Sequence, residues 1–221
     1  MKARLDRQTI ALRVAKEIPD GSVVNLGIGI PDLVVNLIPE GKEAYFQAEN
    51  GVLNFGAVIF DENRIDWDYT DAGGHPVELK PGACFFNHAE SFAMIRGGHI
   101  DMCVLGALQV SEQGDLANWW YPKLGFGNIG GAMDLAAGAK SLWVAMEHAT
   151  KEGEPKILRR CSYPLTAVNC VKKIFTDLAV IEVTEGGLVL REFAPGWTVS
   201  EIQALTEPVL KVSPDLKEIE L

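Results

Sequence analysis

The chain has 221 residues and a mass of 24.1 kDa, so it is long enough to bury a full hydrophobic core and too long for a mini-protein held together by cross-links. Hydrophobic residues make up 48% and charged residues 23% of it, proportions that are usual for globular domains and that exclude a disordered or fibrous chain. With 20 Lys+Arg against 30 Asp+Glu, the formal net charge is -10, which leaves no broad positive surface for nucleic acid.

Nothing in the sequence predicts export or membrane insertion. Residues 2–17 carry charges throughout and leave no apolar centre for a signal peptide, so we expect a cytoplasmic protein. The most apolar stretch, residues 23–38, is interrupted by glycines, a proline and an aspartate, and falls short of the roughly 20 apolar residues of a membrane span. The cysteines show neither paired nor zinc-type spacing, which indicates reduced and mostly buried thiols at Cys84, Cys103, Cys161 and Cys170.

The first half of the chain alternates between helical and extended patterns. Apolar residues at three-to-four spacing and a Pro-Asp-Gly stop predict the first helix, and short apolar runs followed by glycine or asparagine turns predict strands. The expected elements are a helix over 6–18, a strand over 22–26, a glycine turn over 27–31, a helix over 32–38 and a strand over 44–48.

The second half continues this alternation after a less regular segment. Residues 58–84 are rich in Asp, Gly and Pro, which indicates short strands and turns rather than a helix. Residues 118–131 are first aromatic and then rich in glycine. The elements expected around them are helices over 89–96, 132–139 (starting near Asp134) and 199–205, and strands over 101–108, 141–146 and 178–183.

Alternation of this kind predicts an α/β fold. We expect an open, largely parallel sheet flanked by helices, forming a single domain over residues 1–221, because no linker, repeat or change of composition divides the chain. In such sheets the ligand site lies outside the carboxyl ends of the strands.

The common cofactor and nucleophile motifs are absent from the sequence. Gly27-x-Gly29 would need a third glycine at position 32 to bind a dinucleotide, and that residue is Asp32. No phosphate-binding P-loop and no serine nucleophile elbow occur. The pairs His88-x-Glu90 and His99-x-Asp101 lack the further ligands of a metal site, so no metal site is predicted.

Glu49 is the strongest candidate for chemistry. It comes at the carboxyl end of an apolar strand and is followed directly by Asn-Gly, a position that suits either a turn acid facing water or a functional carboxylate at the edge of the sheet. Two glycine-rich turns, Asn25 to Gly29 and Gly130 to Ala132, precede helices, and their backbone N–H groups are suited to binding a developing oxyanion.

These segments together resemble a known family. The run Gln47-Ala-Glu-Asn-Gly-Val-Leu resembles the Ser-Glu-Asn-Gly signature of family I coenzyme A (CoA) transferases, with Ala48 in place of the serine. Residues 25–31, 89–101, 114–119 and 130–135 look like the corresponding segments of the B (beta) subunit of 3-oxoacid CoA-transferases. The resemblance covers nearly the whole chain and implies a CoA-transferase/NagB-like fold.

The resemblance also implies roles for particular residues. Glu49 would be the nucleophile that forms a glutamyl-CoA thioester in a ping-pong reaction. The backbone N–H groups of Gly131 and Ala132 would bind the oxyanion, with the Asn25 side chain beside the substrate. The glycine turns and the residues after the glutamate would contact CoA, namely Gly27, Gly29, Asn50, Gly51 and Gly130.

The resemblance further implies a partner and a substrate class. The partner would be a CoA-transferase A (alpha) subunit in an A2B2 heterotetramer, and the substrates an acyl-CoA such as succinyl-CoA with a short 3-oxo acid such as acetoacetate. CoA would enter as a substrate, without a metal or prosthetic group. Two alternatives remain open: an acyl-CoA hydrolase that uses the same glutamate, and a non-catalytic α/β domain that binds an effector.

Overall fold

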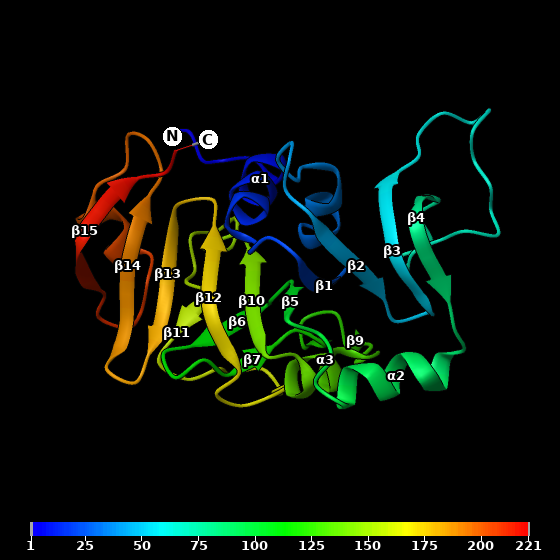
Figure 1. Ribbon diagram of the computed structural model, residues 1–221. Helices are drawn as coiled ribbons and strands as arrows, with labels where there is room; N and C mark the ends of the chain where they lie inside the picture. Colours follow the sequence, from blue (N-terminus) through cyan, green and yellow to red (C-terminus); the bar gives the residue numbers. More distant parts are fainter. Residues whose placement is uncertain (1, 221) are drawn as a thin grey trace.

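A ten-stranded sheet runs across the whole molecule in the computed structural model, which describes residues 2–220 (Figure 1). The strand order is β15-β14-β13-β12-β10-β5-β1-β2-β3-β4. In chain order these strands are β1 (Ser22–Leu26), β2 (Ala44–Ala48), β3 (Val52–Val58), β4 (Val77–Phe85), β5 (Met102–Leu105), β10 (Ser141–Met146), β12 (Val171–Thr176), β13 (Ala179–Thr184), β14 (Gly187–Phe193) and β15 (Lys211–Glu218).

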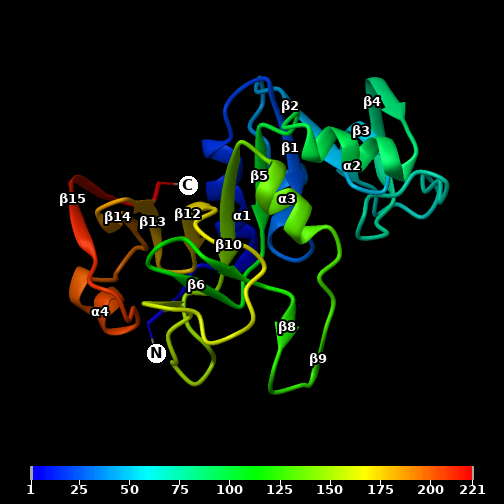
Figure 2. The same ribbon diagram turned by 90° about the horizontal axis from the view of Figure 1, so that it is seen from below.

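Helices and short strands pack on both sides of this sheet (Figures 1 and 2). The helices are α1 (Arg7–Glu17), the 3₁₀ helix η1 (Pro31–Asn36), α2 (His88–Arg96), α3 (Ala132–Gly138) and α4 (Val199–Ala204). The short strands are β6 (Gln109–Ser111), β7 (Leu116–Ala117) and β11 (Ile157–Leu158), which form a small sheet, and the hairpin β8 (Trp120–Tyr121) and β9 (Phe126–Gly127).

The centre of the large sheet is parallel, which confirms the predicted fold class. Strands β12, β10, β5, β1 and β2 pair in parallel, and β2, β3 and β4 are antiparallel at one end, as are β12, β13 and β14 at the other. The short turn between β2 and β3 requires antiparallel pairing, since a parallel crossover needs a dozen or more residues. The strand order reverses at β1, because β2 lies on one side of it and β5, which comes later in the chain, lies on its other side.

Alternate residues of the central strands face two separate hydrophobic cores. On β5, Met102 and Val104 pack with α1 and η1, whereas Cys103 and Leu105 pack with α2 and α3 on the opposite face. This is the period of two expected of a strand that is buried on both sides. The carboxyl ends of β1, β2 and β5 are thereby held in fixed positions.

Several predicted elements have different bounds in the structure. The helix expected over 32–38 is the 3₁₀ helix η1, which begins at Pro31 and contains the β-branched pair Val34-Val35, residues with low helix propensity. The strand expected over 101–108 is β5, which begins at Met102 and ends at Leu105; the N–H of Gly27 bonds the carbonyl of Val104 near this end. Strands β3, β12, β14 and β15 were not predicted, and the segment 58–84 forms one long loop and β4.

The cysteines also differ partly from expectation. All four are free, but Cys103 is the one that is fully buried and Cys84 is exposed on β4, the edge strand of the sheet. Within residues 2–220, no helix combines the length and the apolar character needed to cross a membrane.

Candidate active site

A cavity of about 590 Å³ opens where the loops after β1 and β5 separate. This is the point of the parallel sheet at which the strand order reverses, the usual place for a ligand in an open α/β sheet. The glycine turn after β1 and residues 105–108 after β5 form its two sides, and the turn 128–132 before α3 lies across it. Glu49 lines this cavity.

The turn that presents Glu49 depends on the two residues after it. Gly51 has a φ of 121°, and a Cβ at this position would lie 2.1 Å from the carbonyl oxygen of Phe86. The side-chain amide of Asn50 donates to the carbonyls of Thr70 at 2.8 Å and Asp71 at 3.2 Å. Asn50 and Gly51 therefore fix the turn and the neighbouring loop.

The surroundings of Glu49 make its carboxylate more basic than usual. Burial raises the pKa of Glu49, and the nearby charge of Asp134 raises it further, whereas the charge of His88 and the backbone N–H of Gly131 lower it. Asp134 is itself paired with Arg96 at 2.7 Å. None of the ion pairs among the described residues includes Glu49. It is thus a half-buried carboxylate that forms no ion pair with the residues described.

Gly131 lies directly against Glu49. A Cβ at position 131 would be 2.2 Å from Oε2 of Glu49 and 2.9 Å from Cζ of Phe92, so only glycine allows this approach. Gly131 caps α3 with ordinary dihedral angles, φ -85° and ψ 4°, whereas Gly130 before it has a φ of 48°. The N–H of Ala132 donates to the carbonyl of Ile129 at 3.1 Å.

A buried polar network lies beneath the glutamate. Nδ2 of Asn25 donates to Oε1 of Gln47 at 2.6 Å and to its carbonyl at 3.0 Å, and Nε2 of Gln47 donates to Oγ of Ser91 at 2.8 Å. Sγ of Cys103 lies 4.0 Å from Oδ1 of Asn25. These contacts join β1, β2, β5 and α2, and they fix the end of the strand that carries Glu49.

The cavity brings together six of the nine residues predicted for the site: Asn25, Gly27, Glu49, Gly130, Gly131 and Ala132. Gly29, Asn50 and Gly51 do not line it. The N–H of Gly29 instead bonds the carboxylate of Asp32 at 2.9 Å, which supports the turn.

Sequence reasoning missed the supporting residues. Gln47 and Ser91 form hydrogen bonds across elements that are distant in sequence, so no local pattern marked them. His88, assessed only as a metal ligand, instead lies near Glu49 at the start of α2, with its ring 4.5 Å from that of Phe92. The spacing of His88 and Glu90 in the sequence did not indicate that His88 lies near Glu49.

This arrangement suits a carboxylate nucleophile. Raised basicity strengthens nucleophilic attack, and a backbone N–H beside the carboxylate can stabilise negative charge that develops on the attacked carbonyl oxygen. The side chains that line the cavity are largely apolar or uncharged, so a bound acyl group would be shielded from the acidic protein surface.

Comparisons with known proteins agree with this chemistry. Residues 7–205 match the model of the family described as Coenzyme A transferase. The beta subunit of an acetate CoA-transferase of Escherichia coli K12 is 48% identical over 210 residues, covering 95% of each chain. The B-type subunit of a succinyl-CoA:3-ketoacid coenzyme A transferase of Helicobacter pylori is 47% identical over 206 residues, covering 93% of this chain and 99% of that one.

A solved structure shows the same fold. The acyl-CoA transferase (YdiF) apoenzyme of Escherichia coli O157:H7 aligns with a TM-score of 0.79 at 20% identity. The alignment covers 100% of this chain and 44% of that longer chain.

Proposed function

The chain belongs to the coenzyme A transferase family, and we propose that it is the glutamate-bearing subunit of an enzyme that moves CoA between an acyl-CoA and a short-chain carboxylate. The observation that carries the proposal is the close approach of Gly131 to the half-buried carboxylate of Glu49. It supplies a nucleophile and a fixed N–H donor at one place, as acyl transfer requires.

In the proposed reaction, Glu49 acts twice as a covalent carrier. Its carboxylate oxygen attacks the thioester carbonyl, the carbon–sulfur bond breaks, and a mixed acyl-glutamyl anhydride and the CoA thiolate form. The thiolate then attacks the glutamyl carbonyl, which releases the donor acid as its carboxylate and leaves a glutamyl-CoA thioester. An acceptor carboxylate reverses these steps and leaves with CoA, giving ping-pong kinetics.

The neighbouring residues take supporting roles in this proposal. Gly131 is the principal backbone donor to the oxyanion, and Ala132, whose N–H already bonds Ile129, is a second donor. Asn25 lines the cavity beside the substrate, although both hydrogen bonds from its Nδ2 atom go to Gln47. Gly27 and Gly130 let the CoA thioester approach the backbone.

We propose a short 3-oxo acid such as acetoacetate as the carboxylate, with succinyl-CoA as the donor. The relative named as a succinyl-CoA:3-ketoacid coenzyme A transferase supports this substrate pair. The relative named as an acetate CoA-transferase supports acetate as the alternative carboxylate. A difference of one methylene changes binding by only about 1 to 3 kcal/mol, so the two acids must be compared directly. The reaction needs neither a metal nor a prosthetic group, because a thiolate is a good leaving group.

A second subunit completes the proposed enzyme. The relatives are named as the beta or B-type half of their enzymes, and we propose an A-type partner in an A2B2 assembly in the cytoplasm. Large apolar side chains on the segments that border the cavity support such a partner, since Ile28 is 72%, Phe126 64% and Met133 47% exposed. Covering them would also exclude water from the intermediates.

Intact-mass spectrometry tests the proposal. The chain, purified with its A-type partner, is incubated with succinyl-CoA, acetoacetyl-CoA or acetyl-CoA, treated with borohydride and mapped by peptide. We expect a CoA adduct, or an alcohol after reduction, on the peptide that contains Glu49. Glu49→Gln should abolish it, whereas Glu62→Gln, an exposed acid in the loop before β4, should not.

The outcomes separate the alternatives. An adduct that persists until a carboxylate is added supports the transferase. An adduct that loses CoA to water at the same rate with and without a carboxylate identifies a hydrolase. A folded complex that forms no adduct with any donor refutes the covalent mechanism and favours an effector-binding domain.

A further inference from the structure

Few side chains that line the Glu49 cavity are polar. Four of them are: Asn25, Glu49, Asn118 and Asn128. Among the described residues, no cationic side chain lines this cavity. Glu49 is the proposed nucleophile, and the Nδ2 atom of Asn25 already donates twice to Gln47. Recognition of an oxygen atom on the acyl chain therefore falls to Asn118, to Asn128 or to the backbone.

Asn118 is better placed than Asn128 for this task. The side chain of Asn128 is exposed, and its Oδ1 atom accepts the N–H of Gly130 at 3.0 Å, so it supports the glycine turn before α3. Asn118 is half-buried and directly follows β7. Its amide contacts the carbonyl of Gly106, which also lines the cavity. The amide of Asn118 therefore stands against the loop after β5, at the wall of the cavity.

The side-chain amide of Asn118 is held at both of its polar atoms. Its Oδ1 atom accepts a hydrogen bond from Oγ1 of Thr166 at 2.6 Å, and its Nδ2 atom donates to the carbonyl of Gly106 at 3.1 Å. Because a carbonyl oxygen can only accept, the nitrogen of the amide must face Gly106. The two bonds fix the plane of the amide and, with it, the direction of the second N–H of Nδ2. Within the part of the chain that the structure describes, this second N–H has no acceptor.

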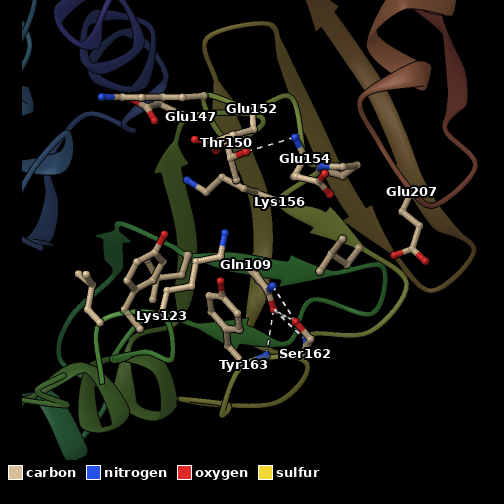
Figure 3. Close-up of a pocket in the computed structure, with 16 residues that line it drawn as sticks. Gln109, Lys123, Glu147, Thr150, Glu152, Glu154, Lys156, Ser162, Tyr163 and Glu207 are labelled. Carbon is tan, nitrogen blue, oxygen red and sulfur yellow. Dashed lines mark hydrogen bonds between the residues drawn. The ribbon is translucent and has the colours of Figure 1, made fainter. Parts of the chain in front are cut away.

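Thr166, which orients this amide, is itself fixed. It is 8% exposed, its N–H donates to the carbonyl of Leu116 at 2.7 Å, and its Oγ1 atom accepts the backbone N–H of Asn118 at 3.2 Å. Four residues earlier in the same segment, the N–H of Ser162 donates to Oε1 of Gln109 at 2.8 Å (Figure 3). The donor of Asn118 is therefore preorganised, and a ligand oxygen gains a hydrogen bond without the cost of ordering a side chain.

Resting on the function proposed above, we propose that Asn118 determines specificity for the acid by donating its free N–H to the oxygen on the third carbon of a 3-oxo acid. The carboxylate of such an acid reacts at Glu49, beside the N–H of Gly131, so the 3-oxo oxygen is the acceptor that remains on the molecule. An uncharged donor suits this oxygen, because a ketone carries no charge. A saturated acid of the same length leaves the N–H of Asn118 without an acceptor, and a buried donor that lacks a partner weakens binding.

Binding of acids to a complex that cannot react is the first test. The Glu49→Gln chain, assembled with its A-type partner, is titrated with acetoacetate and with butyrate, which lacks only the oxygen on the third carbon. Adding Asn118→Ala should weaken acetoacetate binding about tenfold, the effect of one hydrogen bond, and butyrate binding less than about threefold. Asn63→Ala, the same change at an exposed position, should alter neither. Equal weakening of both acids, or equal affinities for them before Asn118 is changed, overturns the proposal.

Variants of Thr166 separate recognition by Asn118 from a general loss of structure. Thr166→Ser keeps the hydroxyl that bonds Oδ1 of Asn118, so it should keep the preference for acetoacetate over butyrate. Thr166→Val removes this hydroxyl and lets the amide turn, so the preference should fall at least about threefold while both acids still bind. An undiminished preference in Thr166→Val would overturn the fixed orientation on which the proposal rests.

Failure of this proposal is distinguishable from failure of the transferase mechanism. The binding test uses a complex that cannot form a glutamyl adduct, so it reports on Asn118 whether or not Glu49 is labelled in the wild type. In the active enzyme, Asn118→Ala should lower kcat/KM about tenfold for acetoacetate and less than about threefold for butyrate, with adduct formation from butyryl-CoA unchanged. Loss of the Glu49 adduct with every acyl-CoA would overturn the proposal, because it would place Asn118 in the chemistry or in CoA binding.

Discussion

Replacing Gly131 by alanine should remove most of the covalent chemistry at Glu49 while leaving the fold intact. The added Cβ would lie 2.2 Å from Oε2 of Glu49, and ordinary contact begins at 3.4 Å, so the carboxylate must move by about 1.2 Å. A displacement of about 1 Å from the reacting geometry costs on the order of 10²-fold in rate, or about 2.7 kcal/mol. The backbone tolerates the change, since Gly131 has a φ of -85°.

The assay is the initial rate of glutamyl-CoA formation under single-turnover conditions, followed by intact mass. Gly106→Ala is the matched control, because Gly106 lines the same cavity and its added Cβ would meet only the carbonyl of Ile28 at 3.7 Å. Gly131→Ala should be slowed about 10²-fold and Gly106→Ala less than threefold, with similar urea midpoints. Equal rates for the two variants would refute the view that contact with Gly131 positions the nucleophile.

Labelling of Glu49 should fall as the pH drops through the raised pKa of its carboxyl group. Because the charge of His88 lowers this pKa, His88→Gln should move the acid limb of the pH profile toward neutral pH, and an unmoved limb would contradict the influence of His88. The guanidinium of Arg13 bonds the buried carboxylate of Glu192 at 2.7 and 2.8 Å. Arg13→Met should therefore lower the free energy of urea unfolding by about 3 to 5 kcal/mol, because it leaves this buried charge without a partner. A loss under about 1 kcal/mol would contradict this reasoning. Burial lowers the pKa of His148 to about 4, so the unfolded chain takes up this proton first as the pH falls below about 6.5. That proton alone should cost about 2.5 kcal/mol of stability by pH 4.5, and an NMR titration in which the His148 imidazole protonates near pH 6.5 would refute it.

The sequence predicted those helices and strands whose apolar spacing and turn residues lie within one short stretch of the chain. The strand-turn-helix order at the start of the chain, the strand before Glu49 and the helix expected over 89–96, which the structure has at His88–Arg96, follow from apolar spacing and from strong stop signals such as Pro-Asp-Gly and Gly-Gly. Strand β15 escaped prediction because it contains Pro214 and Asp215, residues that are depleted in strands, so its pairing with β14 at the sheet edge decides its structure. Strand β14 was missed although its residues alternate between buried and partly exposed. The 3₁₀ helix at Pro31 depends on a bond between Asp32 and Gly29 that composition alone does not indicate.

The candidate site likewise has features that the sequence indicated and features that only the structure shows. Glu49 and the turn at Gly131 are marked by sequence, because a carboxylate at a strand end and consecutive glycines before a helix are local signals. Their contact is not, since it requires the α3 turn to cross the end of β2, 82 residues earlier in the chain (131 against 49). The bonds of Gln47 with Asn25 and Ser91 are equally invisible, because each partner comes from a different element.

Ala48 shows how neighbours in sequence can be separated in chemistry. Side chains alternate along β2, so Gln47 and the following Glu49 face α2 and α3, whereas Ala48 is 5% exposed and packs in the core beneath α1 and η1. The hydroxyl of a serine at position 48 would point into that core, on the opposite side of the sheet from the cavity. Its replacement by alanine therefore changes the packing behind the strand and leaves the reacting face of the site as it is. Under the proposed function, acid preference is therefore to be sought among residues that line the cavity, such as Ile28 and Asn118, rather than at position 48.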